Sequence, residues 1–149
     1  MINLKYKEDL KNVHALAYFN LIKTSSWIEV IIKSTLKPYD LSHAQLNILS
    51  ILVKNHPNAI TANKIKEGII VSNPDVTRLL DKLVKKEFVK RQTCLDNRRQ
   101  IDILITEKGI NFFNEVQTAT KMALQGYYSD KITSEEAKTL YKILNKIRK

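Results

Sequence analysis

The chain has 149 residues, 44% of them hydrophobic, which fits one domain with a buried core and excludes a separate second domain. Its 25 Lys and Arg residues exceed its 15 Asp and Glu residues, and the net charge of +10 predicts an anionic partner, either a polyanion or an anionic membrane. A single cysteine excludes an internal disulfide, the three histidines lack ligand-like spacing, and no apolar run is long enough to cross a membrane. We therefore expect a cytoplasmic protein without cofactor, metal ion or membrane partner.

The first predicted element is a long helix from about Glu8 to Leu36. Its apolar residues recur at helical spacing and form a stripe so wide that it needs more than one neighbour. The stripe contains Leu10, Val13, Leu16, Ala17, Phe19, Leu21, Trp27, Ile28, Val30, Ile31 and Ile32. Pro38 ends the helix, because proline disfavours helical backbone in the residue before it.

A second helix, a short strand and a third helix are predicted next. Ser42 is the expected N-cap of the second helix, which stops in the Asn-His-Pro-Asn segment at 55–58. The pair at 59–60 is expected to form a short strand. Thr61 then caps a brief helix over 62–67, which ends at the following glycine.

The stretch at 71–86 predicts the helix around which the chain is organised. Ser72 or Asn73 is the expected N-cap, and Pro74 suits the first helical position. One face is apolar at helical spacing: Val76, Leu79, Leu80, Leu83 and Val84. The other face carries only charged and hydrogen-bonding groups: Asp75, Thr77, Arg78, Asp81, Lys82 and Lys85. We therefore expect this helix to meet a polar partner.

A β-hairpin with a cationic tip is predicted after this helix. Alternation of apolar and polar residues just after the helix, and again from Ile101 to Ile105, predicts two strands. The turn between them, at 95–100, places Arg98 and Arg99 side by side. Eleven cations and five anions lie within 54–99, so more than half of the net charge falls in less than a third of the chain.

Two amphipathic helices complete the chain. Thr106 is the expected N-cap of a long helix from Glu107 to about Tyr128, and Thr-Ser-Glu-Glu at 133–136 is typical of a capping box that opens a last helix. Together with the first helix, these two present more apolar surface than a small domain can cover. Pairing with a second copy of the chain is the simplest way to bury that surface.

Three motifs in this order resemble the MarR family of bacterial transcription regulators: SNPDVTRLLDKLVKKEFV for a DNA-reading helix, DNRRQ for a wing and LITEKG for the wing exit. The resemblance implies a mainly α fold with a small β wing (α+β), a winged helix-turn-helix with dimerisation helices at both ends. It implies a single domain over 1–149, with a DNA-binding part at about 41–106 and dimerisation helices at about 1–37 and 107–149. One departure is that Asn97 stands where the family usually has Asp.

The resemblance also implies a DNA-binding surface. In a helix-turn-helix pair the second helix enters the major groove while the first crosses the phosphates, so Lys64 is expected to contact phosphate. Arg78 is the expected base-reading residue, because its guanidinium matches O6 and N7 of guanine. Asp75 either accepts from a cytosine amino group or holds Arg78 in place, and we favour the second. Arg98 or Arg99 is expected to enter a minor groove. The full predicted set is Thr61, Lys64, Ser72, Asn73, Asp75, Thr77, Arg78, Lys82, Arg98 and Arg99.

Members of this family bind small aromatic acids or phenols between the DNA-reading part and the dimer, so the resemblance implies a similar effector pocket. The candidate lining residues are His14, Tyr18, Trp27 and Tyr39. Rings with polar tips equally suit core or interface packing. Cys94 lies in the predicted wing, and we interpret it as structural or incidental rather than as a peroxide sensor.

Together, these features predict a sequence-specific regulator of transcription that binds double-stranded DNA. It would act as a ligand-responsive repressor, as a homodimer on a pseudo-palindromic operator. Two alternatives stay open: an architectural, nucleoid-type protein that binds DNA without sequence preference, and a winged-helix module that binds an acidic protein. An enzyme is not expected, because the sequence offers no plausible Cys/His or Ser/His/Asp set and no glycine-rich phosphate loop.

Overall fold

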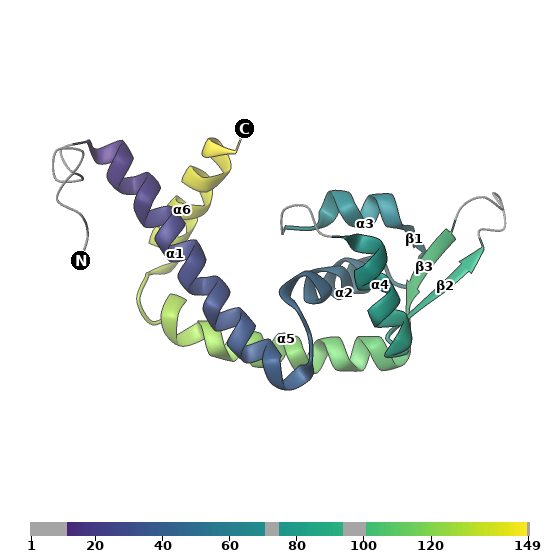
Figure 1. The fold of residues 1–149 in the computed structure, drawn as a ribbon. Coiled ribbons are helices and arrows are strands. Elements are labelled where there is room, and N and C mark those ends of the chain that lie inside the picture. Colours follow the sequence, from purple (N-terminus) through teal and green to yellow (C-terminus); the bar gives the residue numbers. More distant parts are fainter. Residues whose placement is uncertain (1–11, 71–74, 94–100, 149) are drawn as a thin grey trace.

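The computed structural model describes residues 12–70, 75–93 and 101–148, which form six α-helices, one 3-10 helix and a three-stranded antiparallel sheet. In chain order the elements are α1 (Val13–Leu36), η3 (Lys37–Tyr39), α2 (His43–Asn55), β1 (Ile60–Thr61), α3 (Ala62–Gly68), α4 (Val76–Lys85), β2 (Val89–Thr93), β3 (Ile101–Ile105), α5 (Glu107–Tyr128) and α6 (Ser134–Ile147). The helices α2, α3 and α4 and the sheet gather at one end of α5, and α6 lies at its other end (Figure 1). The expected fold class, mainly α with a small β wing, is confirmed.

The buried core lies among α2, α3, α4 and the sheet, and it reaches the first half of α5 and the end of α1. Its apolar side chains are Ile32, Leu36, Leu41, Ile48, Leu49, Leu52, Ile60, Ile65, Val76, Leu80, Leu83, Phe88, Val89, Ile103, Ile105, Phe113 and Val116. Burying a side chain of this size contributes about 1.5–3 kcal/mol. This core therefore holds α4 and the sheet firmly against α5.

Most helix boundaries lie where the cap chemistry predicts them. Ser42, Thr106 and Thr133 cap α2, α5 and α6, as expected. In the capping box of α2, the Ser42 amide donates to Gln45 Oε1 at 2.9 Å and the Gln45 amide donates to Ser42 Oγ at 3.2 Å. In the box of α6, hydrogen bonds from the Thr133 amide and hydroxyl lower the pKa of the Glu136 carboxyl.

The sheet has the order β1-β3-β2, with both pairs antiparallel. Ile103 of β3 pairs with Ile60 of β1 on one side and with Arg91 of β2 on the other. Side chains alternate between the two faces of a strand, so Ile103 and Ile105 point into the core and are 1% and 5% exposed. The hairpin is confirmed, and the short strand expected at 59–60 is present one residue later.

The hairpin is joined to α5 by close backbone contacts. The Thr106 hydroxyl donates to the carbonyl of Glu87 at 2.7 Å, and the Thr106 amide donates to the carbonyl of Phe88 at 3.0 Å. The rings of Phe88 and Phe112 stack with their centroids 4.1 Å apart. Gly109 fits here because it has no side chain: a Cβ atom on it would lie 2.2 Å from the Phe88 carbonyl oxygen.

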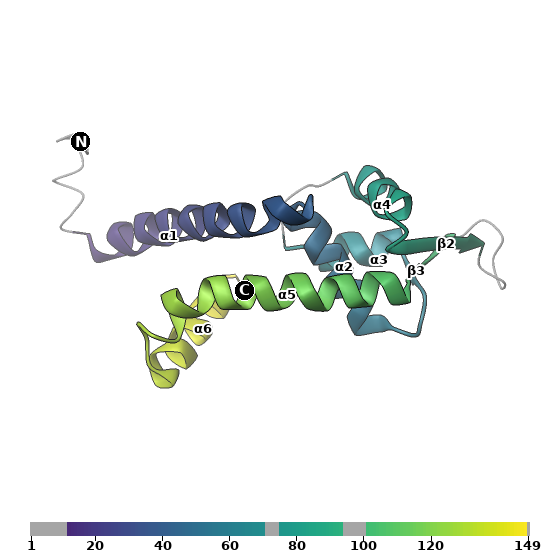
Figure 2. The same cartoon turned by 90° about the horizontal axis from the view of Figure 1, so that it is seen from below.

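The helices far from the hairpin expose much of their apolar surface. Among the described residues of α6 none is buried, and α1 buries only Ile32 and Leu36. The large exposed apolar residues of α1, α5 and α6 are Val13, Tyr18, Phe19, Leu21, Ile22, Trp27, Val30, Met122, Tyr127, Leu140, Tyr141, Ile143 and Ile147. Figure 2 shows α1 and α5 side by side, with α6 at the end of α5 opposite the hairpin.

The first helix begins at Val13 in the described part, with Asn12 as its N-cap; the predicted start near Glu8 lies outside the described residues. Of the helices in the described ranges, none combines the length and the apolar character needed to span a membrane. The same ranges contain no group of three or more His, Cys, Asp or Glu side chains that could hold a metal ion.

Candidate nucleic-acid interface

The helices α3 and α4 form the helix-turn-helix pair expected from the sequence. Thr61 caps α3 by accepting from the Lys64 amide at 3.3 Å, as predicted. Ile65 of α3 and Leu80 and Leu83 of α4 are almost completely buried, so they fix both helices on the core. Each helix therefore has one anchored face and one face free to meet a partner.

The cap of α4 differs from the prediction. The N-cap is Asp75, whose Oδ1 accepts from the Arg78 amide at 3.1 Å, and α4 begins at Val76. A carboxylate three residues before a free amide is a strong N-cap, which is why the helix begins after Asp75. Ser72 and Asn73, the predicted caps, lie outside the described residues, as does the proline that follows them.

The polar face of α4 is exposed as expected, and it carries both cations and anions. Its members are Asp75, Thr77, Arg78, Asp81, Lys82 and Lys85, all exposed, while Val76, Leu80 and Leu83 are buried. On α3 the Lys64 and Lys66 side chains are exposed as well. Asp75 contacts Arg78 through the backbone amide of Arg78. That Asp75 also holds the guanidinium of Arg78 in place stays a prediction.

Sequence reasoning missed one residue of this surface, Arg91 of β2. Its guanidinium donates to Asp81 Oδ1 at 2.6 Å and to the backbone carbonyl of Thr77 at 3.3 Å. A contact between a helix and a strand leaves no periodic signal in the sequence, so only the positions of both elements reveal it.

Two more anions close to this region are paired with lysines. Lys86 Nζ lies 2.7 Å from Asp40 Oδ2, and Lys108 Nζ lies 2.6 Å from Glu87 Oε2. In each case the hydrogen bond, then the charge of the lysine, lowers the pKa of the carboxyl group. These pairs are largely exposed and contribute little stability. Their effect is to reduce the negative potential beside α4.

The wing tip lies outside the described residues, which include neither Arg98 and Arg99 nor Cys94. The described base of the hairpin is β2 and β3, and β2 packs beside α4 (Figure 1). Its residues at 90–93 are exposed, among them Lys90 and Arg91. Arg91 thus continues the polar face of α4, while Lys90 lies on the opposite face of the sheet.

Residues 41–101, which contain this helix pair and most of the hairpin, match the MarR family model. The chain carries a MarR family domain. The HTH-type transcriptional regulator PrsX of Escherichia coli is 24% identical over 125 residues, which are 84% of this chain and 74% of PrsX. A mutant of MarR from E. coli complexed with operator DNA shares the fold with a TM-score of 0.75 and 23% identity, over 90% of this chain and 95% of that one. The organohalide-sensing regulator RdhR, in its 2,4-dichlorophenol-bound form, gives a TM-score of 0.78 and 23% identity, over 92% of this chain and 80% of that one.

The chain thus resembles MarR-type transcriptional regulators in the sequence of residues 41–101 and in its fold. The matched family region ends near the start of β3, while the two similar structures cover 90% and 92% of this chain. The likeness therefore extends to the helices outside the MarR family domain. The expected boundaries within the chain, at about 41 and 106, stay a prediction.

The four predicted effector residues do not meet at one place. His14 and Tyr18 line a groove of about 690 Å³ between α1 and α6. Trp27 instead packs edge-on against Tyr127, with ring centroids 4.8 Å apart. Tyr39 is half-buried and packs edge-on against Phe112 of α5, with ring centroids 6.1 Å apart.

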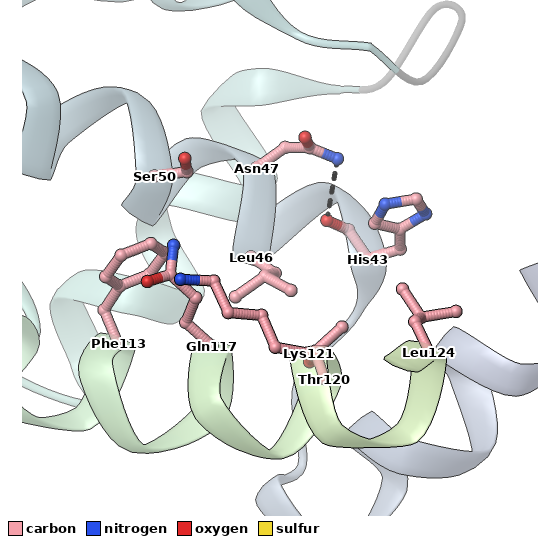
Figure 3. A pocket seen from close by; sticks show the side chains of 9 residues that line it. All are labelled: His43, Leu46, Asn47, Ser50, Phe113, Gln117, Thr120, Lys121 and Leu124. Atoms are coloured by element: carbon pink, nitrogen blue, oxygen red, sulfur yellow. Dashed lines mark hydrogen bonds between the residues drawn. The ribbon is translucent and has the colours of Figure 1, made fainter. Parts of the chain in front are cut away.

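A second, smaller pocket lies where the MarR family domain meets α5. Its volume is about 250 Å³, and it is lined by His43, Leu46, Asn47 and Ser50 of α2 and by Phe113, Gln117, Thr120, Lys121 and Leu124 of α5 (Figure 3). The floor is apolar, and the rim carries amide, hydroxyl and amine groups. His43 also lines the larger groove, and its Nδ1 atom lies 2.7 Å from Glu29 Oε2 of α1. One side chain thus connects both hollows with the first helix.

Proposed function

We propose that this chain is a sequence-specific regulator that binds double-stranded DNA and represses transcription as a ligand-responsive homodimer. The proposal rests on one observation: α4 presents an exposed polar face with three cations, which Arg91 of β2 continues, while its apolar face is anchored in the core. The similarity to a MarR structure complexed with operator DNA supports this reading.

In this proposal two copies place their α4 helices in successive major grooves, about 34 Å apart along the duplex. Arg78 and Thr77 face base edges, and Lys82 belongs to the same surface. Ser72 and Asn73, outside the described residues, are proposed as further DNA contacts. Lys64 and Thr61 of α3 lie toward the phosphates, and Arg98 or Arg99 enters the flanking minor groove. The operator is then a pseudo-palindrome, because its symmetry follows that of the dimer.

Selection of bound sequences from a random duplex pool tests the function directly. We expect enriched half-sites in inverted orientation, with centres about ten base pairs apart. Tight binding without any enriched sequence would instead indicate an architectural DNA-binding protein. A protein that retains no duplex at moderate salt would exclude both functions.

Replacing Lys64 with alanine should weaken binding to the selected duplex and to unrelated duplexes alike, because a phosphate contact carries no base information. The slope of log affinity against log salt should fall by about one for each subunit. A salt titration on both duplexes measures this. The control is Lys142→Ala, which removes the same charge from α6 and should leave the slope unchanged. A wild-type affinity that hardly varies with salt would contradict the phosphate contacts.

The proposed homodimer accounts for the exposed apolar surface of α1 and α6. A second copy is the simplest occupant of the groove between them, whose lining includes Leu140 and Ile143. We expect sedimentation equilibrium to give about twice the 17.2 kDa of one chain. Ile143→Glu should weaken dimerisation by about 100-fold or more, because a carboxylate would be buried in an apolar contact. Lys142→Glu, on the same helix but outside the groove, should stay dimeric.

The proposed effector is a small aromatic or phenolic compound, as in the dichlorophenol-bound form of RdhR. The pocket between α2 and α5 suits such a molecule, since its floor is apolar and Lys121 lies at its rim. An effector acts here only if it binds the DNA-competent dimer less tightly than another arrangement. Adding phenols and aromatic acids during a binding titration tests this, and unchanged affinity for the selected duplex at millimolar concentrations would count against it.

A further inference from the structure

We infer that Arg91 is a positioning residue for DNA recognition, which locks the recognition helix α4 to the base of the wing through Asp81 and Thr77. This inference rests on the proposed function, because it concerns how the DNA-reading surface is held. Arg91 is not expected to read bases itself. It sets the angle at which the helix and the wing meet the duplex together.

The geometry of the contact carries the inference. Arg91 reaches two points on α4 that lie one helical turn apart, the Asp81 carboxylate at 2.6 Å and the Thr77 carbonyl at 3.3 Å. The buried face of α4 already limits its rotation, and a planar guanidinium that spans one turn restrains the small rotation that the core still allows. The backbone of Arg91 is itself fixed, because it pairs with the buried Ile103 in the middle of the sheet.

The position of Thr77, which Arg91 contacts, links this interaction to DNA recognition. Thr77 is one of the residues expected to face base edges, and Arg78 follows it directly on the exposed face. Because these side chains extend outward from the helix axis, even a small rotation of α4 would displace them relative to base edges. Arg91 thus controls the orientation of both groups without touching the duplex.

The contact also changes the charge of the surface. Asp81 lies among the cations of α4, and a free carboxylate there would repel phosphates. The side chains of Arg91 and Asp81 are 33% and 50% exposed, so water only partly screens the pair. Arg91 therefore compensates the one anion in the middle of this face, between Arg78 and Lys85.

Two simpler roles for Arg91, a phosphate contact and a small contribution to stability, predict different results. If Arg91 contacts a phosphate, its loss weakens binding to every duplex alike and Asp81 has no part in the effect. If the pair only adds a little stability, its loss leaves the preference for one sequence over another unchanged. Only a positioning role predicts that substitutions of Asp81 and Arg91 have coupled, non-additive effects on the preference for the selected duplex over the scrambled one.

The test uses the full chain and two duplexes: one selected from a random pool with the wild-type protein, and a scrambled duplex of the same composition. Affinities of Asp81→Asn, Arg91→Gln and the double variant are measured by fluorescence anisotropy, after circular dichroism has established that each is folded. We expect both single variants to bind the selected duplex about tenfold more weakly, and the double variant no more weakly than either, because all three lose one interaction. The scrambled duplex should change by about twofold or less.

Two further variants separate position from charge. Arg91→Lys keeps the charge but lacks the planar fork, so it should lose discrimination about as much as Arg91→Gln. Lys90→Gln removes a charge from the neighbouring residue, which faces the other side of the sheet. It should affect both duplexes alike and leave their ratio unchanged.

Additive losses in the double variant would overturn this inference while the proposed function stands. The same holds if Asp81→Asn tightens binding to both duplexes, or if Arg91→Lys behaves as the wild type does. A wild-type chain that binds neither duplex would instead overturn the proposed function, and this inference with it.

Discussion

Replacing Gly109 with alanine should destabilise the protein by about 3 kcal/mol, which is a large effect for one added methyl group. The new Cβ atom would lie 2.2 Å from the carbonyl oxygen of Phe88 and 2.9 Å from Cγ1 of Ile105. The first of these neighbours is backbone and cannot turn away. Either the start of α5 or the corner before β2 must move, and both are packed in the core. Denaturant unfolding of the wild type and the variant measures the change in free energy.

The matched control is Gly126→Ala, in the same helix. Its new Cβ atom would meet only Asp130 Oδ2 at 3.8 Å, an ordinary contact. Since alanine favours helix over glycine, this variant should gain about 0.5–1 kcal/mol. Opposite signs for two glycine-to-alanine changes in one helix would identify the close approach at Gly109 as the cause. Equal unfolding midpoints for Gly109→Ala and the wild type would contradict it.

The close approach at Gly109 matters for function as well as for stability. It brings the hairpin and α5 together where Thr106 caps the helix and bonds to the strand corner. In the proposed dimer α5 leads away from the DNA toward the partner chain. A shift at this joint would move the wing relative to the dimer, so Gly109→Ala should also weaken DNA binding in whatever fraction remains folded.

Local signals predicted nearly all helices and strands. The boundaries of α5 and the capping box of α6 follow from residues within four positions of each other, because a cap is satisfied by its own first turn. The hairpin follows from alternation with a period of two. The predicted N-cap of α4 was wrong because three polar residues within four positions, Ser72, Asn73 and Asp75, all suit a cap. Only the helix geometry selects Asp75.

Contacts between elements could not be predicted in this way. The pairs Asp81 with Arg91 and Asp40 with Lys86 join residues on different elements, and the sequence does not encode their distance. For the effector pocket, the sequence analysis grouped residues that do not lie together in the structure. Tyr18 and Trp27 are nine residues apart on one helix, which places them about 180° apart around its axis. Helical geometry alone therefore separates them, and in the structure Trp27 packs against Tyr127 instead.

Replacing Arg78 with alanine should cost the proposed dimer the largest share of its affinity for the selected duplex. A bidentate contact to guanine is worth about 1–3 kcal/mol, and the substitution occurs in both half-sites, so we expect a loss of about 100-fold or more. The backbone amide of Arg78 still completes the cap with Asp75 after the change, so α4 itself should persist. Titration of the selected and scrambled duplexes at one salt concentration measures the loss.

The variant Arg78→Lys separates base reading from charge. Lysine keeps the attraction to phosphates but lacks the fork that matches O6 and N7, so its affinity for the scrambled duplex should stay near that of the wild type while the selected duplex is still bound more weakly. Repeating the random-pool selection with Arg78→Ala should then relax the preference at the one base pair per half-site that Arg78 reads. If Arg78→Ala weakens both duplexes equally and leaves every position of the selected site unchanged, Arg78 contacts a phosphate, and base recognition falls to the other exposed groups of α4.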